Sequence, residues 1–118
     1  MAKPHKLQTE FKRLFTLVDV LRTYLDTCAE NIIEAKGKNQ ENEEKYRMHL
    51  SISEAILETL IKKTSVRVLP IKATLSLEWY EANVLVKAIL DYQNKQIGDD
   101  LQQVRADKLK NSIHQLIA

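Results

Sequence analysis

Residues 7–32 read LQTEFKRLFTLVDVLRTYLDTCAENI, and this stretch carries the strongest structural signal in the chain. Its apolar side chains recur at alternating intervals of four and three residues. The members of this apolar stripe are Leu7, Phe11, Leu14, Val18, Leu21, Leu25, Cys28 and Ile32. That spacing places all of them on one side of an α-helix. The stretch therefore predicts a long helix that packs in a helical bundle or hairpin.

The composition is typical of one helical domain. The chain has 118 residues, of which 44% are hydrophobic and 29% charged, so it can bury a core without disulfides. It contains two glycines and two prolines, too few for a turn-rich β-sandwich. The single cysteine, Cys28, lies in the apolar stripe, and we expect a small buried hydrophobe in a reducing environment.

No apolar run approaches the roughly 20 residues that a membrane-spanning helix requires. The most apolar segment, residues 14–25, is interrupted by Thr16, Asp19, Arg22 and Thr23. The N-terminal residues also lack the features of a signal peptide. We therefore expect a cytoplasmic protein with no membrane association.

The sequence predicts an all-α fold, a four-helix bundle built of two antiparallel helical hairpins within one domain, residues 1–118. The expected helices are residues 5–36, 40–64, 76–96 and 99–117. Gly37 and Gly98 fall at the two helix–helix corners, where a residue in the left-handed conformation commonly ends a helix.

An extended connector, about residues 65–75, is expected to join the two hairpins. Pro70 favours an extended conformation at Leu69, and apolar and polar residues alternate on both sides of it. Ser76 is the expected N-cap of the following helix. A strand pair is the less favoured alternative, because an isolated β-hairpin is only marginally stable. The connector is compatible with either an up-down or a crossover topology.

Two helices carry more apolar surface than a monomeric bundle helix normally buries. The residues predicted to lie on this surplus surface are Tyr24, Trp79, Val86 and Leu90. We expect them to form an oligomer or partner interface, with a homo-oligomer favoured. The alternative is that the connector and the last helix cover the surplus within one chain.

The best pattern for catalysis is a pair of Glu-x-x-Glu units, Glu41/Glu44 and Glu78/Glu81. Carboxylates three residues apart share a helix face and can bind Mg²⁺, as in a metal-dependent nucleotide hydrolase. Acidic residues are nevertheless common in the first turn of a helix, so a solvated helix start is favoured. The three histidines fall on separate predicted helices. We therefore expect no catalytic residues, no metal and no cofactor.

Basic residues should gather where the start of the first helix meets the end of the second. This basic pole comprises Lys3, Lys6, Lys12, Arg13, Lys62, Lys63 and Arg67. Such a pole can attract phosphates, which makes nucleic acid or a small anionic ligand an alternative partner. The net charge of +2 is modest for nucleic-acid binding, and no aromatic residue is interleaved to stack on bases.

The leading functional hypothesis is a non-catalytic helical interaction protein: an adaptor, regulator, inhibitor or immunity-type factor. It would act through an apolar helical surface, as a homo-oligomer or with a protein partner that the sequence does not identify. The alternative is a nucleic-acid or nucleotide-binding module that uses the basic pole. A Mg²⁺-dependent nucleotide hydrolase is the third hypothesis.

Overall fold

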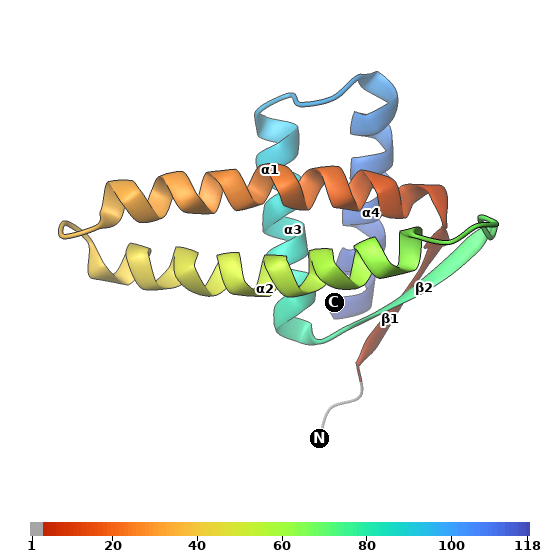
Figure 1. Ribbon diagram of the computed structural model, residues 1–118, viewed down its shortest axis with the longest axis horizontal. Coiled ribbons are helices and arrows are strands. Elements are labelled where there is room, and N and C mark those ends of the chain that lie inside the picture. Colours follow the sequence, from red (N-terminus) through yellow and green to blue (C-terminus); the bar gives the residue numbers. More distant parts are fainter. Residues whose placement is uncertain (1–3) are drawn as a thin grey trace.

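The computed structural model describes residues 4–118 and is mostly helical (Figure 1). Its elements, in chain order, are β1 His5–Glu10, α1 Lys12–Ala35, α2 Gln40–Thr64, β2 Lys72–Leu77, α3 Trp79–Asn94 and α4 Asp100–Ile117. Helix α2 has the predicted bounds, and helix α4 starts one residue after the predicted helix 99–117, with Asp99 as its N-cap. The expectation of a purely all-α fold is wrong, because β1 and β2 form a two-stranded antiparallel sheet.

Residues 5–10 form strand β1 instead of the first turns of the predicted helix 5–36. The register sets Leu7 opposite Leu75, and both side chains are buried. An interval of four residues, such as that between Leu7 and Phe11, returns to the same side in a strand and almost to the same side in a helix. The apolar stripe therefore fits both structures here, and pairing with β2 selects the strand.

Strand β2 replaces the end of the expected connector and the first turn of the predicted helix 76–96. Ser76 lies in this strand, so the expectation that it caps a helix is wrong. Helix α3 begins instead at Trp79, because Glu78 and Glu81 form a capping box. In this box the backbone N–H of Glu78 donates to the Glu81 carboxylate over 2.8 Å. The helix also ends two residues before the predicted boundary.

The helices are arranged as two crossing pairs. Helices α1 and α2 lie side by side and turn at Gly37, whereas α3 and α4 turn at Gly98 (Figure 1). As predicted, both glycines have a left-handed backbone, with φ of +75° and +81°. The α1–α2 pair lies across the α3–α4 pair, so the helices of one pair do not run parallel to those of the other (Figure 1).

Helix α1 lies at the centre of the hydrophobic core because it has neighbours on more than one side. It packs along α2 and is crossed by α3 and α4 (Figure 1). Every member of the predicted apolar stripe is buried except Leu25, which is half-buried. Leu17, Val20 and Tyr24, on the flank of the stripe, are buried as well. Much of the surplus apolar surface is thus covered within one chain.

Candidate interaction surface

An apolar groove of about 320 Å³ lies between helices α2 and α3. The residues that line it are Met48, His49, Ile52, Trp79, Tyr80, Asn83, Val84 and Lys87. Three large side chains at this groove are exposed: Trp79, with 61% of its surface accessible, Tyr80 and Met48. Exposed tryptophan, tyrosine and methionine are enriched in the cores of protein–protein interfaces. We call this site the α2/α3 groove.

The local sequence explains why these side chains meet. Met48 and Ile52 are four residues apart and lie one above the other on α2. The capping box at Glu78 sets the first turn of α3, and Trp79 and Tyr80 are the first two residues of that turn. The capped start of α3 therefore positions both aromatic rings beside Met48 and Ile52 of α2.

His49, which lines the groove, belongs to a buried polar pair. The Tyr24 hydroxyl and Nδ1 of His49 lie 2.7 Å apart and share a hydrogen bond that joins α1 to α2. The pKa of His49 is lowered below its ordinary value, mainly by burial and to a lesser extent by the nearby charges of Lys87 and Lys45. Burial also raises the pKa of Tyr24 well above its usual range. Both groups are therefore neutral at physiological pH, and the pair acts as a structural hydrogen bond.

Cys28 lies beside this pair and is completely buried, as the sequence predicts. Burial raises the pKa of its thiol to about 11, although a hydrogen bond with Tyr24 acts in the opposite direction. The thiol is therefore protonated near neutral pH, which suits a packing residue and not a nucleophile.

The structure divides the four predicted interface residues into two classes. Trp79 and Leu90 are exposed on α3, as the sequence suggested. Tyr24 and Val86 are 4% and 8% exposed, so the expectation that they face outward is wrong. Both side chains belong to the core where α1 contacts α2 and α3, and periodicity along a single helix carries no information about such contacts.

Met48, Ile52 and Tyr80 line the groove but were not predicted as interface residues. Met48 is exposed on α2, whereas Tyr46 and Leu50 on either side of it are partly buried against the core. Tyr80 directly follows Trp79. A search for large apolar side chains off the core-facing stripe would have selected both.

The Glu-x-x-Glu units have structural roles. Glu78 and Glu81 form the capping box of α3, and Glu44 accepts a hydrogen bond from Gln40 in the first turn of α2. Across residues 4–118, no group of three histidine, cysteine or acidic side chains is close enough to hold a metal ion. In the described part of the chain, the four glutamates therefore do not meet in one magnesium site.

Part of the predicted basic pole is engaged in ion pairs. Glu10 lies 3.1 Å from Lys12 and 3.7 Å from Arg13, and Glu58 lies 3.4 Å from Lys62. The hydrogen bond and the charge of Lys12 are the main reasons that the pKa of Glu10 is lowered.

The other members of the basic pole lie in different elements. Lys6 is exposed on β1, Lys63 is exposed near the end of α2, and Arg67 is exposed beyond that end. Lys3 lies outside the described residues. The start of α1 and the end of α2 lie at the same end of the molecule (Figure 1).

No family model, curated protein or solved structure matches the chain. Within residues 4–118, no helix combines the length and apolarity needed to cross a bilayer.

Proposed function

We propose that this chain is a non-catalytic interaction protein that binds a second copy of itself through the α2/α3 groove. The observation that carries the proposal is the exposure of Trp79, Tyr80 and Met48 around one apolar hollow. Tryptophan and tyrosine contribute most of the binding energy at many interfaces, because their large rings lose little conformational entropy on binding.

The charges along α3 favour a second copy as the occupant. Glu78 and Glu81 lie at the start of the helix, and Lys87 lines the groove roughly two turns further on. Two copies related by a twofold axis can set α3 antiparallel to its counterpart. The acidic start of each helix then faces the lysine of the other, and each Trp79 ring meets the groove of its partner.

The two other hypotheses find less support. Lys12, Arg13 and Lys62 already pair with carboxylates, which reduces their attraction for a nucleic acid or nucleotide. Within residues 4–118, Glu78 and Glu81 have no third histidine, cysteine or acidic side chain close enough to complete a magnesium site.

Sedimentation equilibrium of the purified chain over low to high micromolar concentrations tests the proposal. We expect a dimer, and we expect Trp79→Ala to weaken it by about 30-fold or more, as for an interface hot spot. Val104→Ser, at an exposed aliphatic residue of α4, is the matched control and should leave dimerisation unchanged. A wild-type monomer at high micromolar concentration would contradict the proposal.

A further inference from the structure

The loop between α2 and β2, residues 65–71, reads SVRVLPI and exposes an unusual amount of aliphatic surface. Val68 and Ile71 each have 85% of their surface accessible, and Val66 and Leu69 are also exposed. Large aliphatic side chains exposed next to one another in a folded protein usually mark a binding surface. This segment is named the aliphatic loop below.

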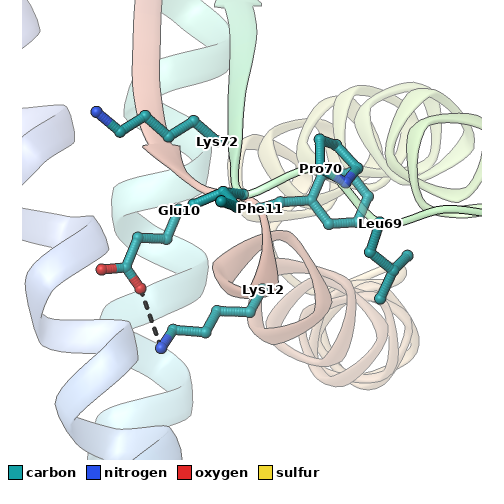
Figure 2. Close-up of a pocket in the computed structure, with 7 residues that line it drawn as sticks. Glu10, Phe11, Lys12, Leu69, Pro70 and Lys72 are labelled. Atoms are coloured by element: carbon teal, nitrogen blue, oxygen red, sulfur yellow. Dashed lines mark ion pairs between the residues drawn. The ribbon is translucent and has the colours of Figure 1, made fainter.

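The base of the aliphatic loop is fixed to the start of α1. The backbone N–H of Phe11 donates to the carbonyl oxygen of Ile71 over 2.9 Å. Phe11, Leu69 and Pro70 line a hollow of about 380 Å³, and Figure 2 shows Leu69 and Pro70 on the side of Phe11 away from the Glu10–Lys12 ion pair. The loop itself projects at the far end of the molecule from the Gly37 turn (Figure 1).

Cations flank the aliphatic loop along the chain, and Arg67 lies within it. Residues 59–77 contain Lys62, Lys63, Arg67 and Lys72 and no acidic residue. The nearest carboxylates in sequence are Glu58, which pairs with Lys62, and Glu78, which belongs to the capping box of α3. Glu10 lies opposite Lys72 in the sheet and forms ion pairs with the first residues of α1. In residues 4–118, no ion pair involves the other three cations, Lys63, Arg67 and Lys72.

We infer that the aliphatic loop binds the surface of an anionic lipid bilayer. Val68, Leu69 and Ile71 would enter the boundary between headgroups and acyl chains, while the surrounding lysines and Arg67 contact lipid phosphates. Apolar insertion combined with cationic attraction is the chemistry that attaches a protein to one leaflet. The sequence-based expectation of no membrane association came from the lack of an apolar run long enough to span a bilayer. Binding to the surface of one leaflet does not require such a run.

The side chains of the loop favour lipid over nucleic acid. Single-stranded nucleic acid is usually held by aromatic rings that stack on bases, and the aliphatic loop contains none. The loop is also a projection, which suits insertion into a fluid surface. It uses residues outside the α2/α3 groove, so this inference and the proposed dimer can fail separately.

Co-sedimentation of the full chain with vesicles tests the inference. One set of vesicles is phosphatidylcholine alone, and in the other about a third of the lipid is phosphatidylserine. We expect binding to the phosphatidylserine vesicles that weakens as salt is raised, and little binding to phosphatidylcholine. The double variant V68S/I71S should bind about 30-fold more weakly or worse, because two aliphatic side chains no longer insert.

Two matched controls separate the loop from general surface properties. Ile33→Ser removes an aliphatic side chain that is 76% exposed on α1, far along the chain from the loop, and should leave vesicle binding unchanged. Charge reversal of Lys63 and Arg67 should abolish binding, whereas the same reversal of the exposed Lys36 and Lys38 should not. Circular dichroism should show that each variant remains folded.

Three outcomes would overturn the inference. The first is no binding to either vesicle, and the second is equal binding by the wild type and V68S/I71S. The third is tighter binding to a single-stranded or duplex oligonucleotide that V68S/I71S leaves intact, since this would assign the cations to nucleic acid.

Discussion

The two corner glycines offer a matched test of how the α3–α4 corner is packed. Both have a left-handed backbone, so alanine introduces similar strain at each. A Cβ atom at Gly37 would meet no atom within 4 Å. At Gly98 it would collide with the hydroxyl oxygen of Tyr92 and approach Cβ of Gln102 to 3.0 Å.

The expected magnitudes follow from these surroundings. Gly37→Ala should lower the free energy of unfolding by about 1–2 kcal/mol, the usual cost of a left-handed alanine. Gly98→Ala should lower it by about 2–5 kcal/mol, because displacing a ring in a packed core adds about 1–3 kcal/mol. Tyr92 is almost completely buried, so its ring has little room to move away.

Urea denaturation followed by circular dichroism measures both values. A double-mutant cycle with Tyr92→Phe isolates the collision, because phenylalanine lacks the oxygen that a Cβ at Gly98 would strike. The loss caused by Gly98→Ala should be at least about 1 kcal/mol smaller in the phenylalanine background. Two results would refute the packing that we describe for this corner. One is an equal loss in the free energy of unfolding for Gly37→Ala and Gly98→Ala, and the other is an equal loss for Gly98→Ala with tyrosine or phenylalanine at position 92.

Three further predictions concern the buried polar groups. The pKa of His49 is lower in the folded state than in the unfolded chain. Below about pH 6.5 the unfolded chain therefore binds more protons than the folded protein, and the free energy of unfolding should fall as the pH falls. Urea titrations at several pH values should show this decline flattened in His49→Gln, and a persistent slope would assign the decline to another group. Cys28 is completely buried and its thiol has a pKa of about 11, so it should react with a thiol reagent at pH 8 only after denaturant is added. Rapid reaction of the native chain would contradict this burial. The hydroxyl of Ser53 is buried without a hydrogen-bond partner in the described structure. Ser53→Ala should therefore raise the free energy of unfolding by about 0.5–1.5 kcal/mol. A loss of stability would show instead that the hydroxyl has a partner.

The basic end of the molecule shows which features of a candidate site can be predicted from the sequence and which cannot. The prediction that Lys12, Arg13 and Lys62 gather there came from the charges along the sequence and from the expected helical hairpin. The sequence pattern did not reveal that Glu10 and Glu58 pair with these side chains. Nor did it distinguish the aliphatic loop from a buried connector, because Val68 and Ile71 are ordinary core residues unless their neighbours in space are known.

Local patterns were sufficient for the long helices and their corners. The apolar stripe from Leu14 to Ile32, the bounds of α2, and the left-handed turns at Gly37 and Gly98 all depend on residues a few positions apart. Such short-range signals are contained in the sequence, because helix periodicity and glycine conformation act within one or two turns.

Contacts between distant segments determined the rest. Residues 5–10 become a strand because they pair with residues 72–77, and their spacing is compatible with a helix as well. Tyr24 is buried where α1 packs against α2 and α3, and its hydroxyl pairs with His49 of α2, whereas Trp79, at the start of α3, remains exposed. Burial depends on which element covers a side chain, and that partner is set by tertiary packing that no single helix encodes.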